Sequence, residues 1–121
     1  NGGVTALDQA QNFLDSGMDG VMIGRAAYHQ PTDLLADADT VIFEQDRAIN
    51  PVNIVHQMMP YIHAHIENGG RLNQITRHML GLFTGRPGAR GWRRVLSERA
   101  HCDGPELVLE ALQRVIEPEA A

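Results

Sequence analysis

Residues 20–25 of the chain read Gly-Val-Met-Ile-Gly-Arg. The apolar part of this stretch is three residues long, is bounded by glycines and shows no polar alternation. That pattern is typical of a strand buried on both faces, as in a parallel sheet. We therefore expect a strand over residues 20–24, with Arg25 directly after its carboxyl end.

A helix is expected immediately before this strand. Its apolar positions Leu7, Ala10 and Leu14 recur at helical spacing, Thr5 can act as the N-cap, and Gly17 can end the helix. Residues 1–24 then form a loop, a helix and a strand, which is the second half of a βαβ unit. Residues 25–49 are expected to form a connector with short helical turns, broken at Pro31 and by the acidic stretch at residues 37–39.

The rest of the chain carries four amphipathic segments. The first starts with Asn50 as N-cap and Pro51 at the first helical position, is expected to kink at Pro60 and ends at Asn68. The expected inward positions of the four segments are Val52, Val55, Met59, Ile62 and Ile66; Leu72, Ile75, Met79 and Leu82; Trp92, Val95 and Leu96; and Val108, Ala111, Leu112, Val115 and Ile116. Short joints between such segments favour a small antiparallel bundle.

Length and composition set further limits. The 121 residues suffice for one domain or a piece of one, and 43% apolar with 21% charged residues is a globular composition. The single cysteine, Cys102, excludes an internal disulfide and a multi-cysteine zinc site. No run of about 20 apolar residues is available for a membrane span, so a cytoplasmic protein is expected. Because the chain starts at Asn1 instead of a methionine, we interpret it as a fragment.

Charge is distributed unevenly along the chain. Residues 1–46 hold eight acidic residues and one arginine, whereas residues 71–99 hold seven arginines and only one acidic residue, Glu98. The overall charge of -5 therefore conceals a basic window. On the expected third helix, Arg90, Arg93, Arg94 and Ser97 share one face. A solvated helix face is the simpler interpretation, but such a face normally mixes signs, so a polyanion such as tRNA is the favoured partner.

Two glycine-containing motifs flank the first helix and the strand. Asn1, Gly2 and Gly3 precede the helix, and Gly24 with Arg25 follows the strand. Both motifs are expected at the same edge of a parallel sheet, where free backbone amides and one arginine can bind a phosphate. In (β/α)8 barrels, loops after the last two strands commonly form such a site. A plain turn at residues 1–3 is the competing interpretation.

Other candidate residues carry weaker signals. His56 and His63 are two helical turns apart, and His65 points elsewhere, so no pair has the i,i+4 spacing that chelates a metal from one helix. Cys102 follows His101, and adjacency in sequence is no evidence of a reactive thiolate. No metal site is therefore expected in this chain, and these histidines and Cys102 are expected to be structural.

Several motifs, taken in order, carry a family resemblance. They are NGGV at 1–4, DGVMIGRAAY at 19–28, RHMLGLF at 77–83, GRPGAR at 85–90 and WRR at 92–94. Together they resemble the C-terminal part of tRNA-dihydrouridine synthases, specifically the A subfamily. The first two motifs are shared with flavin-binding barrels in general, whereas the longer block from 77 to 94 is specific to this subfamily.

The resemblance implies a mostly α chain with a small α/β part: the end of an FMN-binding (β/α)8 TIM barrel, followed by an antiparallel helical bundle domain that binds tRNA. Residues 1–30 would be the end of the barrel, 31–49 a connector and 50–121 the helical domain. The family reduces a D-loop uridine of tRNA to 5,6-dihydrouridine, with FMN as cofactor and NADPH as electron donor. By motif, Asn1, Gly2, Gly3, Gly24 and Arg25 would hold the FMN phosphate, and Arg90 and Arg93 would contact tRNA.

The resemblance also implies what this chain lacks. The cysteine that protonates the uracil would lie upstream of Asn1, so Cys102 is not that residue and the fragment alone is expected to be inactive. No obligate protein partner is implied. Two other classes stay open: a different FMN barrel oxidoreductase with a small-molecule substrate, and a non-enzymatic helical RNA-binding module.

Overall fold

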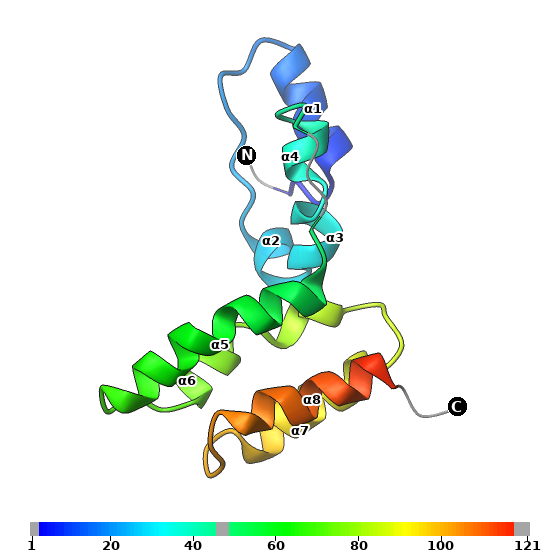
Figure 1. Ribbon diagram of the computed structural model, residues 1–121. Helices are drawn as coiled ribbons and strands as arrows, with labels where there is room; N and C mark the ends of the chain where they lie inside the picture. Colours follow the sequence, from blue (N-terminus) through cyan, green and yellow to red (C-terminus); the bar gives the residue numbers. More distant parts are fainter. Residues whose placement is uncertain (1–2, 46–48, 118–121) are drawn as a thin grey trace. The chain divides into compact units, whose positions relative to one another are not determined.

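The computed structural model describes residues 3–45 and 49–117, and all regular structure in these ranges is helical. The chain divides into two compact units, Asn1–Asn50 and Pro51–Ala121 (Figure 1). The expected division into a barrel end, a connector and a helical domain stays a prediction.

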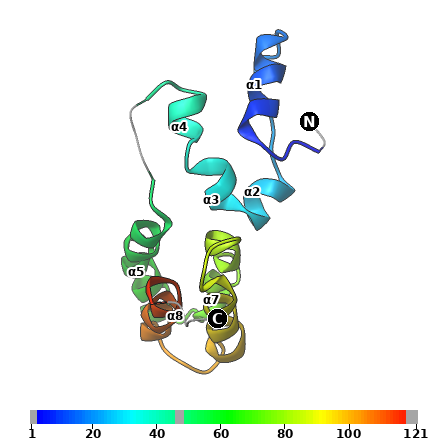
Figure 2. The ribbon, with the colours of Figure 1, turned by 90° about the vertical axis from the view of Figure 1, so that its right-hand side faces the viewer.

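The first unit contains four helices in its described part: α1 (Leu7–Asp15), α2 (Arg25–His29), α3 (Pro31–Leu35) and α4 (Ala38–Val41). Gly17 ends α1 as predicted, because its φ of +106° is a conformation that glycine adopts easily. Thr5 does not cap α1 through its side chain; instead its N–H donates to Gln9 Oε1 at 2.8 Å. Figure 2 shows α2 followed directly by α3, which begins at Pro31.

The expected strand at residues 20–24 is absent from the described structure. These residues have no regular secondary structure before α2, and Met22 is 68% exposed. A strand exists only when its backbone N–H and C=O groups pair with a neighbouring strand. No strand lies in the part of the chain that the structure describes, and Val21 and Ile23 are only partly buried there.

The second unit is built from α5 (Pro51–Glu67), α6 (Asn73–Thr76), the 3₁₀ helix η1 (Leu80–Phe83), α7 (Ala89–Arg99) and α8 (Glu106–Ile116). Pro51 opens α5 as predicted, and the helix continues through Pro60. The core of this unit contains residues that the periodicity selected, together with others that it missed: Val55, Ile62, Leu72, Ile75, Met79, Phe83, Ala89, Trp92, Val95, Leu96, Ala100, Leu107, Val108, Ala111 and Leu112.

The prediction of one continuous helix over residues 72–82 is wrong. The chain forms α6, a turn at Arg77–Met79 and then η1, with i→i+3 hydrogen bonds from His78 to Ile75 and from Met79 to Thr76. The turn exposes the carbonyl of Met79 to the indole N–H of Trp92, which donates to it at 3.1 Å in the core. Trp92 also packs edge-to-face on Phe83, with 4.8 Å between the ring centroids. This tertiary contact outweighs the local helical periodicity.

Two glycines bring α7 and α8 close together. A side chain at Gly88, which has a φ of +86°, would collide with the backbone carbonyl of Arg114, and one at Gly91 would meet the Arg114 side chain. The start of α7 therefore packs against the end of α8, and the two helices are antiparallel (Figure 1). Ile116, expected inside, is 50% exposed because it is the last residue of α8.

Candidate functional site

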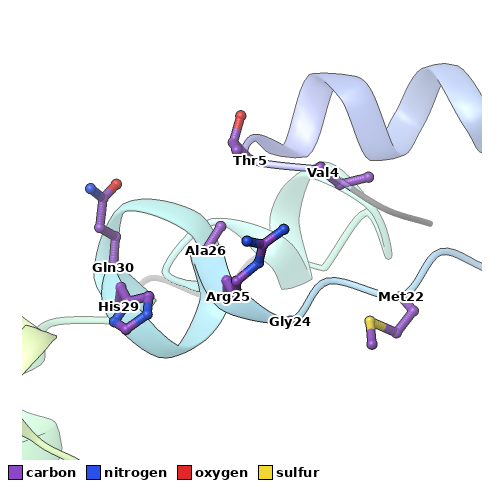
Figure 3. A pocket seen from close by; sticks show the side chains of 9 residues that line it. Val4, Thr5, Met22, Gly24, Arg25, Ala26, His29 and Gln30 are labelled. Carbon is purple, nitrogen blue, oxygen red and sulfur yellow. The ribbon is translucent and has the colours of Figure 1, made fainter.

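A pocket in the first unit brings together both glycine-containing motifs. It has a volume of about 540 Å³ and is lined by Gly3, Val4, Thr5, Met22, Gly24, Arg25, Ala26, His29 and Gln30. Figure 3 shows the Arg25 side chain between the segment at Gly24 and the segment at Val4 and Thr5. Two segments that are well separated in the sequence thus face one cavity.

Local structure explains how these residues reach the pocket. Gly3 has a φ of +80° and no atom within 4 Å of the place a Cβ would occupy, so it forms an open turn before α1. Val4 is buried and fixes this turn to the unit. On the other side, Gly24 lies at the N-cap position of α2 and Arg25 is its first residue. Asn1 and Gly2, also predicted here, lie outside the described residues.

Arg25 is the cationic group of this pocket. It is exposed, and within residues 3–45 and 49–117 its guanidinium forms no hydrogen bond or ion pair. A guanidinium in that state retains all five N–H donors for an anion, and phosphate is the group that its planar fork matches best. No carboxylate is found among the described residues that line the pocket. The chemistry of these side chains therefore fits a phosphate monoester.

The second candidate surface is the basic window at residues 71–99. In the structure some of its arginines are paired with carboxylates. Arg94 Nε donates to Glu98 Oε1 at 3.2 Å, and Arg99 binds both Asp103, at 2.7 Å, and Glu110. Hydrogen bonds to Glu110 and then to Asp103 raise the pKa of Arg99 above its usual value. These two arginines are already matched by carboxylates and contribute little to an anion-binding surface.

Four other arginines of the window behave differently. Within the described ranges, the side chains of Arg71, Arg86, Arg90 and Arg93 form no hydrogen bond or ion pair. Arg90 is exposed and Arg93 half-buried on α7, three residues apart and away from the buried face of Ala89, Trp92, Val95 and Leu96. We call Arg90 and Arg93 the arginine row. It is the part of the window on α7 that remains available to a polyanion within the described ranges.

Sequence reasoning missed several of these features. The i,i+4 spacing of Arg94 to Glu98 and of Arg99 to Asp103 was a visible signal for ion pairs. The Arg99 pair with Glu110 spans 11 positions and two helices, so no local signal announces it. The other pocket residues, such as His29 and Gln30, depend on how α2 is placed next to the turn at Gly3.

Metal ligands and membrane spans are not found in the part of the chain that the structure describes. No group of three or more histidine, cysteine or acidic side chains there is arranged to hold a metal ion. No described helix is both long and apolar enough to span a membrane. Cys102 is an exposed free thiol.

Comparison with known proteins identifies the family. The family model for dihydrouridine synthase (Dus) matches residues 1–117. A tRNA-dihydrouridine(20/20a) synthase of Shewanella oneidensis is 52% identical over 95% of this chain and 35% of its own length. The proteins of the same name from Salmonella typhimurium and Escherichia coli K12 are each 48% identical over 96% of this chain, and 35% and 34% of their own lengths. The chain spans about a third of the length of the curated relatives it matches. This chain belongs to the dihydrouridine synthase family.

Proposed function

We propose that this chain is the C-terminal part of a flavin-dependent tRNA-dihydrouridine synthase that reduces a D-loop uridine of tRNA to 5,6-dihydrouridine with NADPH. The observation that carries the proposal is the joining of Gly3, Gly24 and Arg25 in one pocket. The names of the relatives support it, since they share up to 52% identity with this chain. The chain itself would supply binding contacts and no catalytic residue.

In this proposal the pocket receives the phosphate of FMN. Arg25 would donate charge-assisted hydrogen bonds to the phosphate oxygens, and backbone N–H groups at Gly3 and Gly24, together with Asn1 and Gly2, would complete the contacts. The turn at Gly3 leaves open space for an approaching ligand. When bound, FMN supplies the hydride for the C5–C6 double bond of uracil.

A phosphate site at Arg25 is consistent with the (β/α)8 barrel expected for the longer protein. Residues 20–24 have no regular secondary structure in the part of the chain that is described. In a longer protein they would pair with neighbouring strands and become the last strand of a (β/α)8 barrel, with α1 as the helix before it. Arg25 would then lie at the carboxyl end of that strand, where barrel enzymes bind phosphate groups.

The arginine row would contribute to tRNA binding. A uridine must leave its stack before it can be reduced, and that step costs a few kcal/mol. Contacts to phosphates elsewhere on the tRNA offset this cost, and double-stranded RNA is recognised largely through its shape and backbone. Arg90 and Arg93 have the charge and, within the described ranges, the absence of carboxylate partners that such contacts require.

The test is activity of the full-length protein that contains this sequence. It should be purified with FMN and incubated with NADPH and an unmodified tRNA transcript, and dihydrouridine should be measured by mass spectrometry. We expect one or two D-loop uridines to gain two hydrogens. NADPH oxidation without any change in the tRNA would favour an oxidoreductase with a small-molecule substrate. RNA binding without bound flavin would favour a non-enzymatic RNA-binding module.

A further inference from the structure

A second, smaller pocket lies in the unit of residues 51–121, where α6, η1 and α7 meet. We call it the α6–α7 pocket. Its volume is about 250 Å³, below the roughly 300 to 1,000 Å³ of sites that hold drug-sized molecules. Its apolar lining comes from Leu80, Leu96 and Ala100. The space therefore suits a single small ring system with apolar faces.

The polar residues described in the lining of this pocket carry no negative charge. They are Asn73, Thr76, Arg77, Ser97 and His101, which offer an amide, two hydroxyls, a guanidinium and an imidazole. The amide, the hydroxyls and the imidazole can both donate and accept hydrogen bonds, whereas the guanidinium only donates. Arg77 uses its Nε to donate to His78 at 3.2 Å, and its terminal NH₂ groups have no partner among the described residues. The pocket is thus equipped for the polar edge of a ring and for an adjacent anion.

The pocket continues the arginine row along α7. Ser97 follows Arg93 by four residues and Arg90 by seven, so all three lie on one side of the helix. One helical turn, about 5.4 Å, separates Arg93 from Ser97. An RNA strand whose phosphates contact Arg90 and Arg93 would therefore pass the opening of the pocket. Trp92 is fully buried on the opposite face of α7.

We propose that the α6–α7 pocket binds one unpaired nucleobase of the tRNA, distinct from the uridine that is reduced. An unstacked base combines flat apolar faces with a hydrogen-bonding edge, and proteins read single-stranded RNA by enclosing such bases. The apolar lining would cover the faces, and Asn73, Ser97 and His101 would bind the edge. The inference rests on the proposed function for the identity of the RNA. It adds a base-reading contact to a surface otherwise described by its charge.

The first test fills the pocket. Ser97 is exposed, so Ser97→Phe places a ring in the pocket opening without disturbing the core. In the full-length enzyme, binding of an unmodified tRNA transcript should weaken about tenfold, as expected when two or three hydrogen bonds are lost. The slope of log affinity against log salt should stay unchanged, because no phosphate contact is removed. The matched control is Gln113→Phe on the exposed face of α8, away from the pocket, which should bind as wild type does.

The second test identifies the base. Transcripts with one abasic nucleotide at each unpaired position are bound to wild type and to Ser97→Phe. One position should weaken binding to wild type about tenfold and have no effect on the variant, because the variant has already lost that contact. The proposal would be overturned if Ser97→Phe bound tRNA with wild-type affinity. It would also be overturned if every abasic transcript lost the same affinity for both proteins.

These outcomes are separable from those of the proposed function. Dihydrouridine formation by wild type can succeed while the pocket fails, and the binding comparison requires no turnover. Circular dichroism of Ser97→Phe should match wild type. If it does not, Ser97→Ala, which removes the hydroxyl without adding bulk, should lower affinity by a smaller factor, and an unchanged affinity there would also count against the pocket.

Discussion

Replacing Arg90 and Arg93 together by alanine should lower the salt dependence of tRNA binding by a calculable amount. Each guanidinium that neutralises a phosphate contributes about 0.9 to the slope of log affinity against log salt for a duplex, and about 0.7 for a single strand. Both arginines lack a carboxylate partner within the described residues. The slope should therefore decrease by about 1.4 to 1.8, so the loss of affinity between 50 and 200 mM salt becomes roughly seven- to twelvefold smaller.

The assay is tRNA binding by the full-length enzyme over a salt series, with filter binding or fluorescence anisotropy as readout. The control is Arg94→Ala/Glu98→Ala, which removes the ion pair on the same helix and leaves the net charge unchanged. That pair is solvent-exposed and adds little to stability, so both proteins should keep the helical circular dichroism and flavin content of wild type. An unaltered slope in Arg90→Ala/Arg93→Ala would refute the assignment and make the arginine row a solvated helix face.

Three further outcomes follow from the described contacts. Arg25→Ala should weaken FMN binding to the full-length enzyme by about 1.5 to 3 kcal/mol, the scale of a charged hydrogen bond; unchanged flavin absorbance after dialysis would contradict the phosphate pocket. Gly88→Ala should destabilise the protein by more than the roughly 1 to 2 kcal/mol of a left-handed residue, because the new methyl group collides with the backbone of α8. Gly85→Ala, with a similar φ of +83° and no atom within 4 Å, should show the conformational cost alone, and equal melting temperatures would disprove the contact. Trp92→Phe should lower the free energy of unfolding in urea by about 1 to 3 kcal/mol through loss of the buried indole hydrogen bond, and a change near zero would show that this bond is not stabilising.

The parts of the fold that could be predicted are those governed by local periodicity. The segment starting at Pro51 and the stripes around Trp92 and Val108 form helices with the expected buried faces. The prediction of a strand at residues 20–24 was wrong because strand formation depends on partner strands, which the described residues do not provide. The prediction of one helix over residues 72–82 was wrong because the indole of Trp92, 13 positions beyond Met79, donates to the Met79 carbonyl. A continuous helix would use that carbonyl in its own hydrogen bonds.

The candidate sites were predictable to a similar degree. Gly3 and Arg25 were placed in one site from the expected order of loop, helix and strand, and the structure brings them into one pocket even without the strand. The number of arginines in residues 71–99 predicted where the basic window lies. It overstated how many of these arginines are free of carboxylate partners. Only the three-dimensional packing shows that Arg99 is held by Glu110 of the next helix.

The two glycines at the contact between α7 and α8 separate the residues that can change over evolutionary time from those that cannot. At Gly88 a Cβ would collide with the backbone of α8, and at Gly91 it would press on the Arg114 side chain, so neither position accepts a larger residue without a shift of its neighbour. The exposed side of α7 carries no such restriction, since Arg90 and Ser97 contribute nothing to the core. A lineage can therefore exchange the residues proposed to contact the nucleic acid one at a time while the scaffold beneath them is preserved. Under the proposed function, altered RNA preference would then be accessible by single substitutions on one helix.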